Sequence, residues 1–192
     1  YGDHRDLHVR SRRQRQMCIR DRYATYLNDI IPPEINTFVG HSFGGRVAVH
    51  LSFLREINNL VLIGVPLLRI TPKKRYVNKL TLFKNLNKFG LVSSATVESI
   101  KNKTGSFDYR NSEGVMRETL VKAVNDDLED KLPNIKSNVK LVWGENDMDV
   151  PVSIAEKSQK LISNSELTII PNQGHNMLRS NPISVFEVLK SL

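Results

Sequence analysis

Three side chains have the types that catalysis by a nucleophilic serine requires: Ser42, Asp147 and His175. A serine hydroxyl is a poor nucleophile near neutral pH unless an imidazole removes its proton and a carboxylate holds that imidazole in the correct tautomer. Long stretches of chain separate the serine from the other two. The hypothesis of a Ser-His-Asp site therefore depends on elements that bring all three together.

The serine stands in the motif G-H-S-F-G-G at residues 40–45, between apolar runs at 35–39 and 46–51. This pattern predicts a strand, a sharp turn and a helix, with the Ser42 hydroxyl at the apex of the turn over the end of a sheet. We call this turn the elbow and the strand before it the elbow strand. The glycines two residues before and after the serine suit a turn in which a Cβ would clash. The alternative interpretation is an ordinary glycine-rich turn that the serine caps.

Asp147 and His175 each follow a predicted strand. Asp147 comes shortly after the apolar run 139–143, and His175 comes shortly after the run 167–170. The carboxyl ends of parallel strands meet at one edge of a sheet, where open α/β sheets build their sites. We therefore predict that Asp147 is the acid and that His175 is the base.

Other interpretations of the polar residues stay open at this point. Asp147 could be a turn aspartate or a helix cap before Pro151, although Asp149 fits the capping role better. Asp149 is also the second candidate for the acid. His41 and His50 are interpreted as structural histidines.

The remaining pattern predicts an α/β fold with a mostly parallel sheet and a helical insertion. The run 60–64 is wholly apolar, which is typical of a parallel strand buried on both faces. The other expected elements follow from apolar periodicity and from proline positions: helices from 23 to before Pro32 and at 46–55, 73–89, 115–128, 152–162 and 182–192, strands at 35–39, 139–143 and 167–170, and a polar loop at 101–111.

These elements divide the chain into a core at 23–66 and 132–192 and a helical insertion at 67–131. The helix expected at 73–89 carries Lys and Arg beside a broad apolar face. It fits a surface helix packed on the core, a cap over the active site, or a helix that lies on a membrane surface.

Three segments resemble the signature segments of the α/β-hydrolase superfamily, and the likeness covers about Tyr23 to the C-terminus. They are the motif at 40–45, the pattern W-G-x-x-D-x-x-x-P at 143–151 and Gly174-His175. The resemblance implies that residues 67–131 are the variable cap that shapes the substrate pocket.

The resemblance also implies a role for each site residue. Ser42 would attack an acyl carbon, His175 would carry the proton, and Asp147 would orient His175. The backbone N–H of Phe43 would donate one hydrogen bond to the oxyanion. No cofactor and no metal are expected.

The superfamily has several strands and a helix before the elbow strand, and a loop in that part supplies the second oxyanion donor. Here only about a dozen residues lie between Ile35 and the N-terminal segment 1–22, which is not expected to belong to the fold. We therefore expect the chain to be the C-terminal two-thirds of a hydrolase with an exposed sheet edge. As given it should be inactive or nearly so, whereas the completed gene should hydrolyse short p-nitrophenyl esters.

Residues 1–22 have no structural periodicity and hold seven arginines against three aspartates, half of the chain's net charge of +8. By composition this is a disordered basic arm. The string at about 8–22 also resembles translated sequencing-adapter read-through at the ends of metagenome-derived gene fragments. We therefore expect a non-native arm, with the protein proper beginning near Tyr23.

Composition narrows the remaining function classes. The 192 residues, 40% hydrophobic and 25% charged, suit one globular domain. No apolar run approaches the roughly 18 residues of a membrane span, so we expect a cytoplasmic protein without stable membrane insertion. The lone Cys18 allows no internal disulfide. Beyond residue 22 the chain is only mildly basic, so no nucleic-acid partner is expected.

The serine at the elbow argues against the dehalogenase and epoxide-hydrolase branches, which place an aspartate there. The leading hypothesis is a hydrolase of a small-molecule carboxylic ester or related acyl substrate that works through an acyl-enzyme. One alternative is a carbon–carbon bond hydrolase of aromatic catabolism that cleaves vinylogous diketones. The other is a non-catalytic, ligand-sensing member.

Overall fold

The computed structural model describes residues 19–69, 74–97, 99, 112–114, 127–190 and 192. The loop expected at 101–111 lies outside these residues, as does nearly all of the helix expected at 115–128. The chain forms two compact units, Tyr1–Leu68 with Asp126–Leu192, and Arg69–Asn125. The second unit begins two residues after the start of the predicted cap at 67–131 and ends six residues before the end of that cap.

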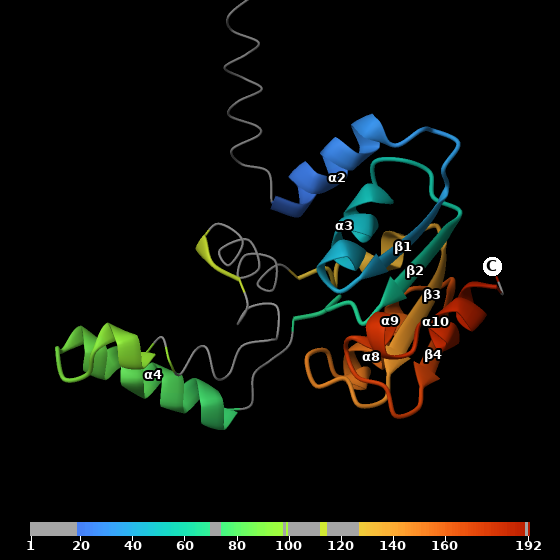
Figure 1. Ribbon diagram of the computed structural model, residues 1–192. Coiled ribbons are helices and arrows are strands. Elements are labelled where there is room, and N and C mark those ends of the chain that lie inside the picture. Colours follow the sequence, from blue (N-terminus) through green and yellow to red (C-terminus); the bar gives the residue numbers. More distant parts are fainter. Residues whose placement is uncertain (1–18, 70–73, 98, 100–111, 115–126, 191) are drawn as a thin grey trace, which may run out of the picture. The chain divides into compact units, whose positions relative to one another are not determined.

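A parallel sheet of four strands organises the first unit (Figure 1). Its order is β1-β2-β3-β4, and each neighbouring pair is parallel. The predicted α/β class with a parallel sheet is confirmed. The strands are β1 (Thr37–His41), β2 (Asn59–Ile63), β3 (Asn138–Gly144) and β4 (Ser165–Ile170).

Helices connect and cover these strands. α2 (Ile19–Ile30) packs on α3 (Phe43–Leu51), α3 packs on β1 and β2, and α8 (Val152–Leu161) packs on β3 and β4. The first unit contains α2 (Ile19–Ile30), α3 (Phe43–Leu51), the short 3₁₀ helix η1 (Leu132–Asn134), α8 (Val152–Leu161), α9 (Met177–Ser180) and α10 (Pro182–Leu189). The second unit contains α4 (Lys74–Lys88).

Several boundaries differ from the sequence prediction. β1 begins two residues later than expected, because a turn in which the Ile35 N–H bonds to the Pro32 carbonyl precedes it. α3 starts directly after Ser42 and ends at Leu51, short of the expected 46–55. α2 begins at Ile19, inside the arm expected to be non-native, and the short α9 was not predicted.

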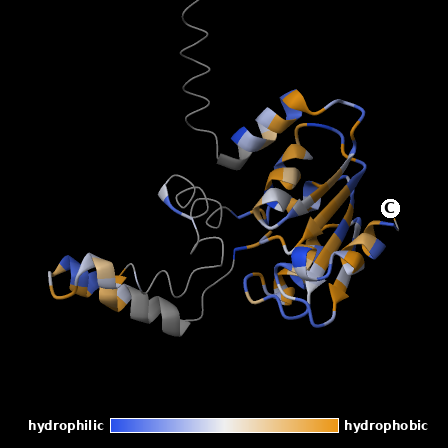
Figure 2. Ribbon diagram, viewed as in Figure 1, coloured by the Kyte–Doolittle hydropathy of each residue, from blue (hydrophilic) through white to orange (hydrophobic). Residues whose placement is uncertain are grey.

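The core lies on both faces of the sheet. Side chains alternate along a strand, so Val61 and Ile63 of β2 face one side while Leu60 and Leu62 face the other, and all four are fully buried. Val61 and Ile63 pack with apolar side chains from β3, β4, α9 and α10, which are Val142, Ile170, Met177 and Val185. Figure 2 shows the corresponding concentration of apolar residues along the strands.

Among the described residues, no helix combines the length and apolarity that a membrane span needs.

Candidate active site

The turn after β1 holds Ser42 in an unusual backbone conformation. Its φ is 50° and its ψ is −117°, values that a residue with a Cβ rarely adopts and that cost on the order of 1–3 kcal/mol. Its N–H bonds to the Ile63 carbonyl at 3.0 Å, which ties the turn to the end of β2. The side chain makes no capping hydrogen bond to α3, so the capping interpretation is wrong.

Two glycines, Gly40 and Gly45, make this turn sterically possible, whereas the sequence predicted Gly40 and Gly44. A Cβ on Gly40 would overlap the Gly45 backbone, and a Cβ on Gly45 would overlap the Val65 side chain. A Cβ on Gly44 would meet nothing within 4 Å. The expected clash of a Cβ is therefore confirmed at Gly40 and wrong at Gly44. The first turn of α3 directs Gly45, rather than Gly44, against Gly40 of β1.

Gly40→Ala and Gly44→Ala form a matched pair that tests this packing. Gly40→Ala should lower the free energy of unfolding by about 2 kcal/mol or more, because backbone must move to admit the methyl group. Gly44→Ala should leave stability unchanged or raise it by up to about 1 kcal/mol, since Gly44 is helical and alanine favours the helix. Urea unfolding measures both, and equal losses would contradict the packing account.

The structure brings Ser42, His175 and Asp147 together in a chain of hydrogen bonds. His175 Nε2 lies 3.1 Å from Ser42 Oγ, and His175 Nδ1 lies 2.8 Å from Asp147 Oδ2. The Asp147 side chain is fully buried and that of His175 is 9% exposed. A carboxylate accepts the Nδ1 proton, which leaves the Nε2 lone pair for the serine hydroxyl.

The loop after β3 holds Asp147 by its other oxygen. Asp147 Oδ1 accepts the backbone N–H groups of Asp149 at 2.9 Å and Val150 at 2.7 Å. Trp143 Nε1 donates to the Val150 carbonyl at 2.9 Å and fixes the end of that loop. Asp147 is thus a turn aspartate whose side chain also bonds to His175. Asp149 contributes its backbone N–H, which donates to Asp147 Oδ1.

The loops after β3 and β4 interlock. The Asn146 N–H bonds to the Gln173 carbonyl at 2.8 Å, and the Asn172 N–H bonds to Glu145 Oε2 at 3.0 Å. A Cβ on Gly144 would overlap the Gln173 carbonyl. These contacts fix the loop that carries His175 against the loop that carries Asp147.

Comparisons with solved structures give the same architecture. A lipase-esterase related protein from Clostridium acetobutylicum is 21% identical with a TM-score of 0.64, and the match covers 91% of this chain and 76% of that one. A serine hydrolase involved in carbazole degradation is 23% identical with a TM-score of 0.60, over 91% of this chain and 70% of that one. The chain has a partial α/β-hydrolase fold. A meta-cleavage product hydrolase from Pseudomonas fluorescens is 16% identical with a TM-score of 0.59, over 88% and 70%. No family model and no curated protein matches the sequence.

Within this α/β-hydrolase fold, Gly64 borders the His-Asp pair. This contact was not predicted from the sequence. It follows β2 with φ of +54°, and a Cβ there would lie 3.2 Å from both Asp147 Oδ2 and His175 Nδ1. Glycine after an apolar strand is a usable sequence signal for a turn. Its contact with the pair depends on tertiary structure alone.

Phe43 is the first residue of α3, so its backbone N–H has no carbonyl within the helix to bond. The positive end of the helix dipole lies here, which favours negative charge next to Ser42. The Phe43 ring meets the Tyr23 ring edge to face at 5.8 Å between centroids. α2 therefore supports the position from which the predicted oxyanion donor would act.

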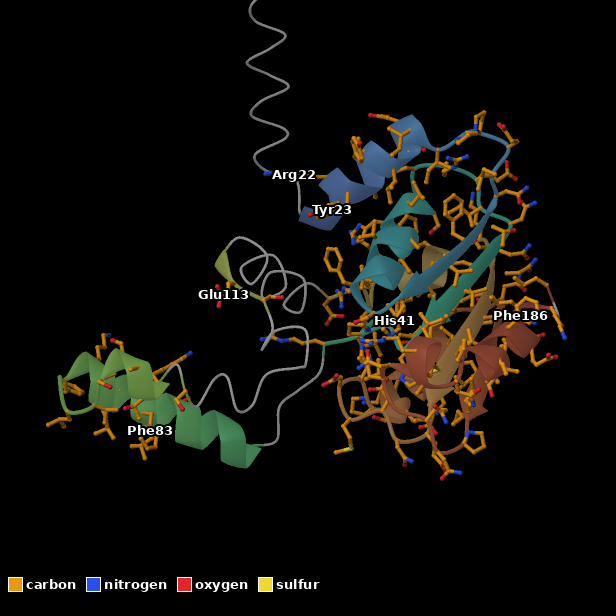
Figure 3. The ribbon with its side chains drawn as sticks, in the orientation of Figure 1. Arg22, Tyr23, His41, Phe83, Glu113 and Phe186 are labelled. Atoms are coloured by element: carbon orange, nitrogen blue, oxygen red, sulfur yellow. The ribbon has the colours of Figure 1, made fainter. Side chains whose placement is uncertain are left out.

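His41, which is labelled in Figure 3, is the last residue of β1. His41 Nε2 is 2.9 Å from the His175 carbonyl oxygen, and the two ring centroids are 4.9 Å apart. His50, in contrast, is buried within α3. Across the described parts of the chain, no group of three or more His, Cys, Asp or Glu residues is arranged to hold a metal ion.

Proposed function

We propose that this protein is a serine-dependent hydrolase of a small-molecule carboxylic ester or a related acyl substrate, with Ser42, His175 and Asp147 as its catalytic residues. The observation that carries the proposal is the hydrogen-bonded series from Ser42 Oγ through His175 to a fully buried carboxylate. The strained backbone at Ser42 supports it, since strain at a turn between strand and helix presents the hydroxyl.

The reaction follows from this arrangement. Ser42 Oγ bonds to the acyl carbon while its proton passes to His175 Nε2. Asp147 stabilises the imidazolium, and the Phe43 N–H stabilises the oxyanion. The oxyanion collapses, the carbon–oxygen bond to the alcohol breaks, and His175 protonates the departing alkoxide. Water then cleaves the acyl-enzyme, with His175 first accepting and later returning one proton.

Carbon–carbon bond hydrolysis is the second candidate. Two of the structural neighbours support it by name, a meta-cleavage product hydrolase and a serine hydrolase of carbazole degradation. The same three residues would serve a vinylogous diketone, with the leaving group departing as a stabilised carbanion that takes a proton. Residues 67–131 would select between the substrates as a cap.

Labelling with a fluorophosphonate tests the nucleophile directly. The probe phosphonylates an activated serine hydroxyl and releases fluoride, so intact mass and peptide mapping report one adduct and its position. We expect a single adduct on Ser42 that heat unfolding abolishes. An adduct elsewhere, or none on the folded in-frame product of the parent locus, would refute the assignment.

A substrate panel separates the candidate reactions. The panel holds short p-nitrophenyl esters and a vinylogous diketone, and it is run on the 192-residue chain and on the in-frame product of its parent locus. The second protein is included because, by resemblance, a loop before the elbow strand supplies the other oxyanion donor. Preferential ester turnover supports the first candidate, and preferential diketone turnover the second. Labelling without turnover of either, together with tight ligand binding, would favour a ligand-sensing role.

A further inference from the structure

A hydrogen bond connects the strand that precedes the serine to the backbone of the histidine. His41 Nε2 lies 2.9 Å from the His175 carbonyl oxygen, across 134 residues of sequence. A carbonyl oxygen can only accept, so His41 carries its proton on Nε2 and donates it. His41 is therefore a fixed donor at the end of β1, directed at the main chain of the residue that bonds Ser42.

The two imidazole rings also pack against each other. Their centroids are 4.9 Å apart and their planes are inclined at 43°. The Gly64 position lies against His175 Nδ1 and Cε1, where a Cβ would come within 3.2 and 3.3 Å. His175 thus has its ring nitrogens on Asp147 and Ser42, its ring against His41 and its carbonyl on the His41 donor.

The position of His41 in the turn gives this contact its significance. His41 ends β1, and the next residue is Ser42, whose N–H is bonded to the Ile63 carbonyl. The segment that places the hydroxyl therefore also places the donor for the His175 backbone. A shift of the loop after β4 away from β1 would lengthen the 3.1 Å distance between His175 Nε2 and Ser42 Oγ.

We propose that His41 is a positioning residue, whose Nε2–H anchors the His175 backbone to β1 and so holds the His175 imidazole within hydrogen-bonding reach of Ser42. The inference rests on the proposed function, because it assigns His41 a part in nucleophile activation. The His41 imidazole acts here through the His175 carbonyl oxygen. Its loss should lower the rate of the chemical step and leave substrate affinity unchanged.

Three substitutions separate the hydrogen bond from simple packing. His41→Gln places an amide N–H near the position of Nε2, His41→Asn keeps a polar amide but is too short to reach, and His41→Leu fills the space without a donor. Misplacement of a reacting group by about 1 Å costs on the order of 10²-fold in rate. We expect labelling rate and kcat to fall about 10- to 100-fold in His41→Asn and His41→Leu with KM unchanged, and His41→Gln to stay within about 3-fold of wild type.

Thermal unfolding first shows which variants are folded. The fluorophosphonate labelling rate is then measured on these variants. The values of kcat and KM are measured on the in-frame product of the parent locus, called here the parent-locus protein. His41→Asn keeps the test decisive if His41→Leu does not fold. Wild-type rates in His41→Asn would overturn the proposal, and so would a His41→Gln variant as slow as His41→Asn. A change confined to KM would also overturn it, since a positioning residue acts on the chemical step.

An NMR measurement distinguishes failure of this inference from failure of the proposed function. If wild-type protein shows neither labelling nor turnover, the proposed function fails, and the resonance of the proton on His175 Nδ1 then decides the role of His41. A resolved signal in wild type and His41→Gln that broadens or disappears in His41→Asn supports the anchor. The same signal in all three proteins overturns it.

Discussion

Ser42→Ala is expected to lower turnover of the parent-locus protein by about 10⁶-fold, the loss typical of removing the nucleophile from a serine-histidine-carboxylate unit. The change deletes only the oxygen that lies 3.1 Å from His175 Nε2. Alanine meets the same backbone strain at φ 50° as serine does, so stability should change by less than about 0.5 kcal/mol. Initial rates with a p-nitrophenyl ester and the loss of the fluorophosphonate adduct measure the effect.

Ser153→Ala is the matched control for this substitution. Ser153 is exposed on α8 and has no part in the proposed site, so its loss should leave both rate and labelling unchanged. Wild-type turnover in a folded Ser42→Ala protein would show that the nucleophile lies elsewhere.

Asp147→Asn is expected to lower turnover by about 10⁴-fold, because an amide reverses the tautomer of the histidine. The N–H groups of Asp149 and Val150 hold one side-chain oxygen of residue 147. An asparagine that keeps these two bonds must turn its NH₂ group toward His175 Nδ1. Nδ1 then has to accept, so the ring proton moves to Nε2 and faces the Ser42 hydroxyl, which can no longer give up its proton there.

Asp149→Asn is the matched control, and it decides between the two candidate acids. Asp149 contacts Asp147 through its backbone N–H, which the substitution keeps, so turnover should stay within about twofold of wild type. The steady-state rate of each variant is compared with its thermal stability. Loss of activity in Asp149→Asn with retention in Asp147→Asn would reverse the assignment.

Much of this fold was accessible from sequence because local pattern and topology agree. The apolar runs at 35–39, 60–64, 139–143 and 167–170 predicted all four strands within two residues at either end. The expectation that Asp147 and His175 lie near Ser42 followed from one rule, that loops at the carboxyl ends of parallel strands share an edge. Because the four strands are in parallel register, the three side chains do meet there.

The details that sequence reasoning missed depend on tertiary contacts. Motif spacing indicated Gly44, but the backbone angles of Ser42 determine which glycine of α3 turns toward Gly40. β1 was expected to end before Gly40, because the motif at 40–45 was assigned to the turn, although Gly40 and His41 both pair with β2. The roles of Gly64 and His41 were hidden, since each acts on a residue far along the chain.

The interlocked loops after β3 and β4 have a consequence for how the site assembles during folding. Only 28 residues separate the two members of the His-Asp pair, both carried by β3, α8 and β4, whereas 133 residues separate His175 from Ser42. Closing a short loop costs less entropy than closing a long one, and local contacts form sooner. The acid and the base should therefore pair early, within one strand-helix-strand unit, and capture of the serine should be the late, rate-limiting event in completing the site.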